Sequence, residues 1–509
     1  MGVAARFDHG KRLTDRARAH GTADHGFAAR LSAAAVARLG ELRTERIGIV
    51  GLGREGVDLV EFLAPRAREV VVSDRAPAER LQEALTALRG FDVRFSLGQQ
   101  TAEDLVDCDE IFVSPGVAQS EPVVARARAV GARVSSATRL FFELCPGPII
   151  GITGSSGKTT TTTMVGSILA AGDIPSVVGG NIGTPMLRRL PDITEQTWCV
   201  LELSSFQLAD VSQSPRIAAI LNITPNHLDR HADMEDYVRA KANIIRHQLP
   251  VDTAILNADD PIVRSLAHAS ATVDFRMTGP ASGAWYDGSI LWLASPPGGD
   301  GHFVPLLNRA EINLRGDHNV ANALAAACIA QAAGCGVEPI RRALRAFEPV
   351  AHRLEVVATV DGVTYVNDSI ATSPERSMAA LRSFDAPVVL IAGGRDKHTP
   401  MEDWAQLISR RARAVVLVGE AAPLIDRALR AAGSSVPVTI ARSFSEVVRL
   451  ATRAAEPGDV VLLSPGCTSF DEFRDYEARG EAFRASVASL ASSSPPRARR
   501  PRVSRVGPC

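Results

Sequence analysis

The chain has 509 residues, of which 46% are hydrophobic, 22% charged and 5% aromatic. This balance is typical of a globular protein, and the length suggests about three domains of ordinary size. The formal net charge of −1 at pH 7 provides no excess of positive charge, which argues against a general nucleic-acid-binding or membrane-surface role.

The sequence carries no mark of a secreted or membrane-inserted protein. No apolar run is long enough to span a bilayer, and the first residues, Met-Gly-Val-Ala-Ala-Arg, lack the apolar core of a signal peptide. The seven cysteines are scattered and include no C-x-x-C pair, which is typical of a reducing compartment and of a protein without structural zinc. We therefore expect a cytoplasmic protein that neither binds nucleic acid nor inserts into membranes.

Lysine is nearly absent from the sequence. Arginine supplies almost every basic side chain, and the only lysines are Lys11, Lys158, Lys241 and Lys397. A lysine amine can take part in chemistry that a guanidinium cannot perform. Lys11 has the context of a chance surface residue, and Lys158 belongs to a motif described below, so Lys241 and Lys397 become candidates for chemistry.

The chain begins with an extension, residues 1–44, that is rich in Ala, Arg and His. Within it, residues 27–39 have the apolar spacing of a short amphipathic helix. We assign no function to this extension.

A dinucleotide-type βαβ pattern follows the extension. A strand leads into Gly51-Leu-Gly-Arg-Glu-Gly56, a helix is expected over Val57–Leu63, and a second strand ends at Asp74. G-x-G-x-x-G with an acid about twenty residues later marks a Rossmann-like unit. Further strands at 110–114 and 132–135 complete a first domain, residues 45–147. Taken alone, this pattern also fits an NAD-dependent oxidoreductase.

A second glycine-rich turn opens the next part of the chain. An apolar strand runs into Thr153-Gly-Ser-Ser-Gly-Lys-Thr159, and a helix follows to about Leu169. Gly151, Gly154 and Gly157 are expected to let the backbone bend so that successive N–H groups face an anion. Lys158 adds a point charge and Thr159 a hydroxyl for Mg²⁺, so this turn predicts a phosphate-binding P-loop. It departs from G-x-x-x-x-G-K-[ST] because Gly151 lies one residue before the place of the first glycine.

A buried acid marks the strand expected over Cys199–Gln207. Glu202 lies among apolar neighbours, and a carboxylate there is costly unless it meets a cation. In a P-loop protein that cation is Mg²⁺, whereas a buried arginine is the alternative. The next strand, Ile217–Ile223, runs into the polar segment Thr224–His231, at the end of the sheet where open α/β folds bind ligands.

The elements that follow complete a central domain, residues 148–349. A helix over Met234–Leu249 carries Lys241, short β segments occupy about 272–313, and a long Ala-rich helix runs from Gly316 to about Ala333.

The last third alternates strands with helices and predicts a C-terminal domain, residues 350–490. The Ser/Pro/Arg-rich residues 491–509 predict a disordered basic tail. The fold class is therefore α/β, with an N-terminal Rossmann-like domain, a central P-loop ATPase with a mostly parallel sheet, and a C-terminal Rossmann-like domain. The strands expected in the last domain are Val363–Asn367, Val388–Gly394, Ala414–Gly419, Val438–Ala441 and Val460–Ser464.

Together these motifs resemble the Mur ligase family, over about Ile47 to Leu490. Folylpolyglutamate synthetases share the P-loop variant but do not resemble this chain at the N-terminus. The motifs that carry the resemblance stand in the family's order and are Gly151–Thr159, Gly180–Gly183, Leu201–Leu208, Asn222–His231, Gly316–Leu324, His352–Glu355, Asn367–Thr372 and Leu463–Phe473.

The resemblance implies an ATP-dependent amide ligase of cytoplasmic peptidoglycan synthesis. Such an enzyme adds D-glutamate to UDP-N-acetylmuramoyl-L-alanine through an acyl phosphate, which the amine of the amino acid attacks. The first glycine-rich turn would then hold uridine diphosphate rather than NAD.

For the nucleotide and the metal, the resemblance implies roles at matching positions. Lys158, Glu202, His227 and Lys241 would be catalytic. Mg²⁺ would meet Thr159, Glu202, His227 and Lys241, the last as a carbamylated lysine. The residues implied to contact ATP are Thr153, Gly154, Ser155, Ser156, Gly157, Lys158, Thr159, Thr160, Asn322, Arg353 and Asp368.

The resemblance also implies where the other two substrates bind. Thr372, Lys397, Ser469 and Tyr476 would hold glutamate. The residues implied for the UDP substrate are Gly51, Gly53, Arg54, Glu55, Asp74, Arg75, Ser114, Asn181, Ser204 and Gln207.

Two positions near the expected amino-acid site depart from the family pattern. Asp-Ser-Lys-Ala-Thr reads Asp368-Ser-Ile-Ala-Thr372 here, and Tyr476 replaces a phenylalanine. Because Ile370 removes a cation, ligation of L-glutamate is an alternative. A non-catalytic nucleotide switch is a further alternative, although it leaves the expected metal and lysine set unexplained. We expect small-molecule substrates as partners and a monomer.

Overall fold

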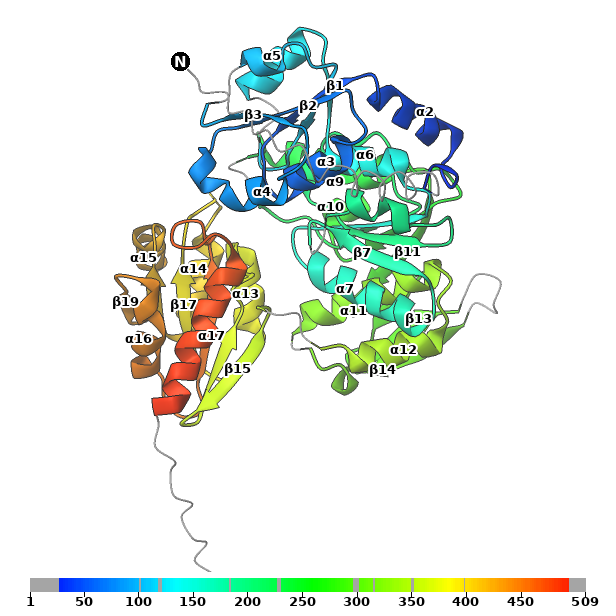
Figure 1. Cartoon of the computed structure of the whole chain (residues 1–509). Helices are drawn as coiled ribbons and strands as arrows, with labels where there is room; N and C mark the ends of the chain where they lie inside the picture. The colour runs from blue at the N-terminus through cyan, green and yellow to red at the C-terminus, as the bar shows by residue number, and fades with distance from the viewer. Residues whose placement is uncertain are drawn as a thin grey trace, which may run out of the picture. The chain divides into compact units, whose positions relative to one another are not determined.

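The structure is a computed structural model that describes residues 27–99, 102–117, 121–182, 185–226, 230–295, 302–314, 316–348, 352–397 and 399–493. Within these residues the strands form three mostly parallel sheets of five, nine and six strands (Figure 1), which confirms the predicted three-domain α/β class. The described residues up to 348 form one compact unit and those from 352 onward form another. The residue limits of the three domains remain predictions. No helix in the described part of the chain is long and apolar enough to cross a membrane.

The first sheet is parallel and carries helices between its strands. Its elements are β1 (Arg46–Val50), α3 (Arg54–Leu63), β2 (Glu69–Asp74), α4 (Gln82–Ala87), β3 (Arg94–Leu97), β4 (Glu110–Val113), α5 (Pro122–Ala129), β5 (Arg133–Ser135) and α6 (Ala137–Leu144). The strand order β3-β2-β1-β4-β5 reverses direction at β1, which is the Rossmann topology and places a ligand crevice at the carboxyl ends of β1 and β4. The Rossmann-like pattern predicted for these residues is confirmed, although α3 begins three residues earlier than expected and the sequence analysis missed β3.

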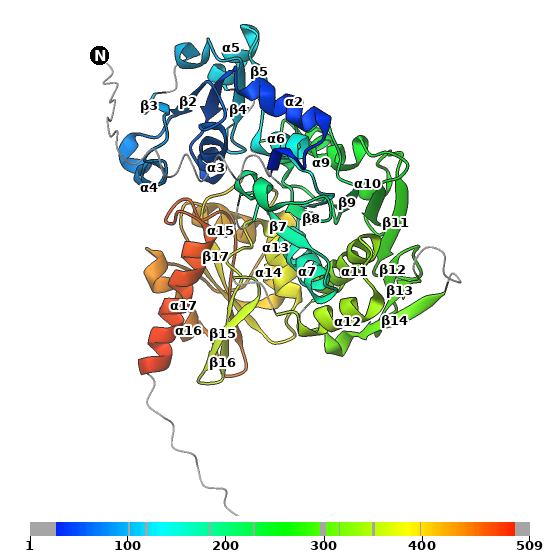
Figure 2. The same cartoon turned by 45° about the vertical axis from the view of Figure 1, so that its right-hand side comes forward.

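The central sheet has the order β14-β13-β12-β11-β10-β9-β6-β8-β7, and only the pairings among β12, β13 and β14 are antiparallel. Helices α7 and α11 pack side by side on this sheet, α7 against β6, β7 and β8 and the Ala-rich α11 against β9 to β13, and α12 packs on α7 (Figure 2). The elements are β6 (Ile149–Thr153), α7 (Lys158–Ala171), β7 (Ser176–Gly180), η3 (Leu187–Asp192), β8 (Trp198–Glu202), α8 (Ser205–Leu208), β9 (Ile217–Ile220), α9 (Met234–Arg246), β10 (Thr253–Asn257), α10 (Pro261–Arg264), β11 (Ala271–Arg276), β12 (Ala284–Tyr286), β13 (Ile290–Ala294), β14 (Phe303–Asn308), α11 (Asp317–Ala332) and α12 (Val337–Ala346).

The second unit contains the third sheet, with the order β15-β16-β20-β17-β18-β19. All five predicted strands are present. The sequence analysis missed the antiparallel edge strand β15 and the last helix, α17. The elements are β15 (Glu355–Val360), β16 (Val363–Asn367), α13 (Pro374–Arg382), β17 (Val388–Gly393), α14 (Glu402–Arg411), β18 (Ala412–Val418), α15 (Ala422–Ala431), β19 (Val438–Ile440), α16 (Val447–Ala454), β20 (Val460–Gly466) and α17 (Tyr476–Ser493).

The first two sheets share one apolar core. A single cluster of buried side chains joins Phe112 of the first sheet to Leu187 of η3 and Ile244 of α9. A buried carboxylate adds polar contacts, because Asp58 of α3 accepts hydrogen bonds from the Leu187 N–H at 2.9 Å and the Arg188 Nε at 3.0 Å. The first and central domains are therefore held in one unit by both apolar packing and hydrogen bonds.

Part of the expected N-terminal extension belongs to this unit. Helix α2 (Ala33–Leu42) begins at Ser32, whose side chain accepts from the Ala35 N–H, so it lies further along the chain than the predicted helix over residues 27–39. Phe27 and Leu42 are 1% and 0% exposed and belong to the shared core. Residues 1–26 lie outside the described residues.

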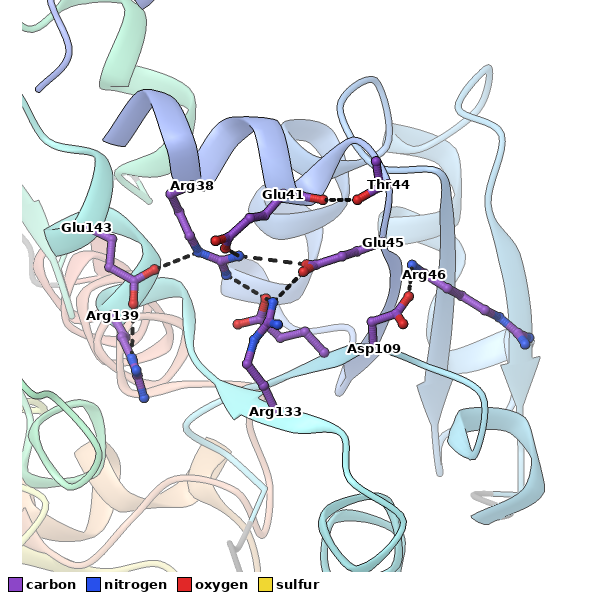
Figure 3. A network of polar contacts seen from close by, with 10 residues as sticks. Arg38, Glu41, Thr44, Glu45, Arg46, Asp109, Arg133, Arg139 and Glu143 are labelled. Carbon is purple, nitrogen blue, oxygen red and sulfur yellow. Dashed lines mark hydrogen bonds and ion pairs between the residues drawn. The ribbon is translucent and has the colours of Figure 1, made fainter. Parts of the chain in front are cut away.

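One arginine of α2 meets four carboxylates (Figure 3). Arg38 donates to Glu143 of α6 at 2.9 Å and to Glu110 of β4 at 2.5 Å, and it also pairs with Glu41 and Glu45. The Glu110 side chain is only 4% exposed, and burial raises the pKa of its carboxyl even though arginines lie beside it. This carboxylate therefore depends on Arg38 for most of its compensation.

We predict that Arg38→Met destabilises the first unit by about 3–5 kcal/mol, because it leaves the Glu110 and Glu143 carboxylates buried with less positive charge. Arg43→Met, at the exposed end of the same helix, is the matched control and should change stability by less than about 0.5 kcal/mol. Urea unfolding followed by tryptophan fluorescence measures both. Equal unfolding midpoints for the two variants would contradict the assigned role of Arg38.

A second carboxylate links the first domain to the central one. Glu55, in the first turn of α3, accepts a hydrogen bond from Gln207 Nε2 at 2.7 Å. Its other oxygen is buried and has no hydrogen-bond partner among the described residues. Burial, the largest cause, raises the pKa of Glu55 from 4.5 to about 7. The ionised form is thus disfavoured in the folded protein.

This pKa predicts how stability changes with pH. Since the folded pKa lies above the unfolded one, Glu55 has no effect below about pH 4.5, and its ionisation destabilises the fold increasingly up to about pH 7. Glu55→Gln should therefore be more stable than the parent at pH 8, by roughly 3 kcal/mol, and nearly equal to it at pH 4.5. Thermal unfolding at the two pH values measures this, with the exposed Glu79→Gln as control. A stability difference that is the same at both pH values would rule out the proposed titration.

Candidate active site

The expected P-loop follows β6, an interior strand of the central sheet. Strand β6 pairs in parallel with β8 on one side and β9 on the other. In this register Ile152 lies opposite Glu202 of β8 and Ala219 of β9. The carboxyl ends of all three strands therefore meet at one edge, which is where an open α/β sheet binds its ligand.

The glycines of the loop have different roles. Gly157 has φ 81°, and a Cβ there would lie 2.3 Å from Asn322 Oδ1 of α11, so only glycine fits and Asn322 is brought against the loop. The expectation that Gly151 helps the backbone bend is wrong. Gly151 lies inside β6, where a Cβ would lie 2.5 Å from the Pro215 side chain, so its role is packing of the strand.

Two lysines converge on one backbone oxygen of the loop. Lys158 Nζ donates to the Gly154 carbonyl at 2.8 Å, and Lys241 Nζ donates to the same oxygen at 3.0 Å. Lys158 and Lys241 are 9% and 2% exposed. Lys241 also lies over the ring of Tyr237, 4.8 Å from its centroid. Two ammonium groups that share an acceptor in a buried place repel each other.

The buried acid lies beside the start of α7. Glu202 is 2% exposed and accepts from Thr159 Oγ1 at 2.8 Å and from Asn181 Nδ2 at 2.8 Å. Within the described residues it forms no ion pair with an arginine, so the arginine alternative finds no support there. A hydroxyl oxygen and a carboxylate oxygen are ligands of the kind that Mg²⁺ prefers. Thr159 and Glu202 therefore fit a magnesium ion. His227, the other expected metal ligand, lies outside the described residues.

Two other residues expected at the nucleotide, Thr153 and Ser155, have hydroxyl groups that bond to other parts of the protein. Thr153 Oγ1 donates to the Leu203 carbonyl at 2.8 Å, and Ser155 Oγ contacts the Thr224 carbonyl and the Tyr237 hydroxyl, both at 2.9 Å. These contacts tie the loop to the strand ends.

Ser156 of the loop and Thr160 of α7 differ in their hydrogen bonds. The Ser156 N–H donates to Asn222 Oδ1 at 2.8 Å. Thr160 is 1% exposed, and its hydroxyl has no partner among the described residues. The residues of the loop that remain candidates for direct phosphate contact are therefore its backbone N–H groups, Lys158 and Thr159.

The sequence analysis missed a hydrogen-bonded chain next to the loop. His231 Nδ1 contacts Asp236 Oδ2 at 2.9 Å and Nε2 contacts Ser205 Oγ at 2.9 Å. The ring stacks on Phe206, with centroids 5.1 Å apart, and meets Tyr237 edge-on. Ser205 is 2% exposed, so this chain fixes the start of α9, which carries Lys241, rather than facing a substrate.

The residues expected at the uridine diphosphate gather at the carboxyl ends of β1, β2 and β4. Asp74 accepts from the Leu52 N–H at 2.6 Å, and Ser114 Oγ donates to the Gly51 carbonyl at 2.8 Å. These two side chains hold the first glycine-rich turn in shape. The exposed residues of this group are Gly53, Arg54 and Arg75, the last of which pairs with Glu121.

The expected substrate residues of the central domain are also brought near this edge. Asn181 is exposed and bonds Glu202. Ser204 and Gln207 form a capping box at the start of α8. Gln207 is only 3% exposed and reaches Glu55, so its side chain serves as a link between domains.

Two residues of the second unit are expected at the nucleotide, and one of them, Arg353, lies in a strained turn. Arg353 lies between His352 and Leu354, which have φ 61° and 44°, a region costly for residues other than glycine and often found at functional sites. Asp368 is 4% exposed and accepts from Ser464 Oγ at 2.8 Å. Burial, the largest cause, raises the pKa of Asp368 to about 7.

The expected glutamate residues follow neighbouring strands of the third sheet. Thr372 follows β16, Lys397 follows β17 and Ser469 follows β20, and these strands pair in the order β16-β20-β17. The Gly466 N–H donates to the Ala371 carbonyl at 2.8 Å, which joins the end of β20 to the loop after β16. Tyr476 begins α17, and its carbonyl accepts from Ser369 Oγ at 2.8 Å. The second unit therefore brings all four residues to one edge of its own sheet.

Comparison with known proteins agrees with this organisation. Residues 45–136 match the family described as "Mur ligase MurD-like, N-terminal domain", residues 152–330 match "Mur ligase middle domain", and residues 352–467 match "Mur ligase, glutamate ligase domain". Two curated relatives, from Symbiobacterium thermophilum and Roseiflexus sp., are both named UDP-N-acetylmuramoylalanine--D-glutamate ligase. Each is 42% identical to this chain; the alignments cover 88% of it and 98% and 100% of the relatives.

Solved structures show the same fold at lower identity. The UDP-N-acetylmuramate-alanine ligase of Thermotoga maritima aligns with a TM-score of 0.57 at 19% identity, over 88% of this chain and all of that one. The MurF ligase of Thermotoga maritima, solved in complex with ADP, aligns with a TM-score of 0.53 at 19% identity, over 89% of this chain and all of that one. With three family domains in order and relatives that match along nearly their whole length, the chain belongs to the Mur ligase family.

Proposed function

We propose that this protein is an ATP-dependent ligase that joins D-glutamate to UDP-N-acetylmuramoyl-L-alanine in peptidoglycan synthesis. The observation that carries the proposal is the P-loop edge, where Lys158, Thr159 and Glu202 meet, in a chain 42% identical to two curated D-glutamate ligases. The names of these relatives favour D-glutamate over L-glutamate. Nothing supports an NAD-dependent oxidoreductase.

The reaction needs an activated carboxylate. An oxygen of the alanyl carboxylate attacks the γ-phosphorus of ATP, and ADP leaves. The amine of D-glutamate then attacks the carbonyl carbon of the acyl phosphate, and phosphate leaves as the amide forms and the amine loses a proton. The loop N–H groups and Lys158 bind the phosphates, so the protein acts mainly by positioning groups and by compensating charge.

Thr159 and Glu202 hold Mg²⁺ in this proposal, together with His227. When bound, Mg²⁺ neutralises charge on the phosphate oxygens. The contact of Thr159 with Glu202 supports this assignment, because it already places a hydroxyl and a carboxylate oxygen side by side.

Lys241 is carbamylated in the active protein. The shared acceptor of Lys158 and Lys241 supports this, because two buried ammonium groups at one carbonyl are unfavourable. After loss of a proton, the neutral Lys241 amine would attack carbon dioxide, forming an N–C bond and releasing a second proton. The resulting carbamate would replace the repulsion with an attraction and would offer a carboxylate to Mg²⁺. An arginine could not form this carbamate.

The other substrates bind at the remaining edges. The crevice at β1 and β4, lined by Gly51, Gly53, Arg54 and Arg75, receives the uridine diphosphate. Asn181 and Ser204 lie along the muramoyl part. Asn322 and Arg353 contact the adenine and the phosphates of ATP, and Asp368 lies near its ribose. Thr372, Lys397, Ser469 and Tyr476 hold the glutamate.

The protein works as a monomer in the cytoplasm, with small molecules as its partners. All cysteines in the described part of the chain are free thiols, which supports a reducing compartment.

The proposed activity predicts phosphate release that depends on all substrates. With ATP, Mg²⁺ and UDP-N-acetylmuramoyl-L-alanine, D-glutamate should stimulate release at least about tenfold over the reaction without amino acid, with a turnover on the order of 1–100 per second. Stimulation by L-glutamate alone would show that L-glutamate, the alternative amino acid, is the substrate. No stimulation by either amino acid would contradict the proposed function.

Substitution of Lys241 tests whether this residue acts as a carbamate or as a simple cation. Lys241→Ala and Lys241→Arg should both lower turnover more than about 100-fold, since neither side chain can form a carbamate. Added acetate or formate should partly restore Lys241→Ala, and carbon-13 NMR with labelled bicarbonate should show a carbamate signal only in the parent. Glu235→Ala, exposed on the same helix, should keep full activity. Full activity of Lys241→Arg, or no carbamate signal in the parent, would rule this assignment out.

A further inference from the structure

The proposed amino-acid site lacks a cation at position 370. Ile370 is 7% exposed and cannot bind a carboxylate. Glutamate brings two carboxylates and an amine, and each carboxylate needs a cation or several N–H donors when it leaves water. Among the residues proposed for this substrate, only Lys397 is cationic. The chain must therefore supply positive charge from another position.

Arg376 lies in the right place to do so. It stands in the first turn of α13, six residues after Ile370, and its Nη1 donates to the Ile370 carbonyl at 3.1 Å. Arg376 is also among the groups that lower the pKa of Asp368 against the larger effect of burial. Both observations place the guanidinium beside the loop 368–372.

This loop is built into the edge that carries the other glutamate residues. The Asp368 and Ala371 backbone groups bond the Leu463 carbonyl and the Gly466 N–H, both at 2.8 Å. The Ser377 hydroxyl, next to Arg376, donates to the Ser464 carbonyl at 2.8 Å. Helix α13 is thus fixed to β20, the strand that precedes Ser469.

We propose that Arg376 binds a carboxylate of the incoming glutamate and so supplies the cation that is absent at Ile370. This inference rests on the proposed function. A guanidinium presents a planar fork of donors that matches a carboxylate. The start of α13 adds to this, because its N-cap residue Ser373 is 1% exposed and the Ser373 hydroxyl has no hydrogen-bond partner among the described residues.

A neighbouring acid limits how much negative charge can bind at Arg376. Glu375 stands beside Arg376 in the same turn and disfavours a second negative charge there. Lys397 follows the neighbouring strand β17 and contributes positive charge close to Cys467, in the loop after β20. Arg376 and Lys397 then each bind one of the two carboxylates of a glutamate, one from each side of this edge of the third sheet.

The test is a D-glutamate titration of the full-length enzyme at saturating ATP, Mg²⁺ and UDP-N-acetylmuramoyl-L-alanine. Arg376→Ala should raise the KM for D-glutamate on the order of 10- to 100-fold, the range expected for loss of a charged hydrogen bond, while the KM for ATP changes less than about twofold. Arg376→Lys should recover part of the loss. The double variant Ile370→Lys, Arg376→Ala should also lower the KM below that of Arg376→Ala. Arg382→Ala, exposed at the far end of the same helix, is the matched control and should match the parent.

The outcomes separate this inference from the function on which it rests. An unchanged KM for D-glutamate in Arg376→Ala, with the parent active, overturns the role of Arg376 and leaves the function intact. A loss of turnover with unchanged KM and no recovery in Arg376→Lys also overturns it, because this would be a structural effect on the Ile370 loop. A parent that no amino acid stimulates overturns both.

Discussion

The chemistry of this protein depends on one backbone oxygen. The Gly154 carbonyl accepts from both Lys158 and Lys241, and it follows directly after β6, an interior strand of the central sheet. The register of β6 with β8 and β9 brings Glu202 to the same edge, and the His231 chain of hydrogen bonds fixes the helix that carries Lys241. Two cations and one anion are thus concentrated in a place with little water, where charges act strongly. That arrangement is unfavourable in isolation and becomes favourable when phosphates and a metal ion bind.

The packing around this site explains why it can hold unfavourable charges. The first and central domains share a core, and the buried carboxylate of Asp58 is compensated across their boundary by η3, whereas Glu110 is compensated by Arg38 of α2. Burial of this kind contributes specificity of position more than net stability. It keeps the carboxyl ends of β1 and β6 in a fixed relation, which a substrate with a uridine diphosphate at one end and a reacting carboxylate at the other requires.

Sequence reasoning predicted the strands well because most are apolar runs between glycine-rich turns. It missed β15, whose hairpin with β16 turns at Asp361 and Gly362, with φ 51° and 83°. Asp-Gly is a signal for this turn, and Glu355–Val360 is rich in valine, so the sequence contained signals for this strand that were not used. It missed α17 because Ser and Ala blur the apolar period. It also could not assign α2 to the core, since Arg38 meets Glu110 and Glu143, which lie more than seventy residues away in the sequence.

Within the site, motifs predicted which residues gather but not which atoms face the ligand. Thr153, Ser155 and Gln207 belong to the motifs, yet their side chains bond other parts of the protein. Gly151 matches a P-loop glycine in sequence and serves as a packing residue in a strand. Such differences depend on which neighbour occupies the adjacent strand or helix, and this information is absent from a local pattern. The same holds for Arg376, whose guanidinium reaches position 370 only because helix α13 folds back beside the loop.

The central claim is that the P-loop edge activates a carboxylate by phosphorylation. The most direct test uses UDP-N-acetylmuramoyl-L-alanine labelled with oxygen-18 in its carboxylate, with mass spectrometry of the phosphate released during ligation of D-glutamate. The account predicts that each released phosphate carries one labelled oxygen, because the carboxylate oxygen leaves with the phosphoryl group. Unlabelled phosphate would show that ATP is hydrolysed without formation of an acyl phosphate, and it would contradict this account.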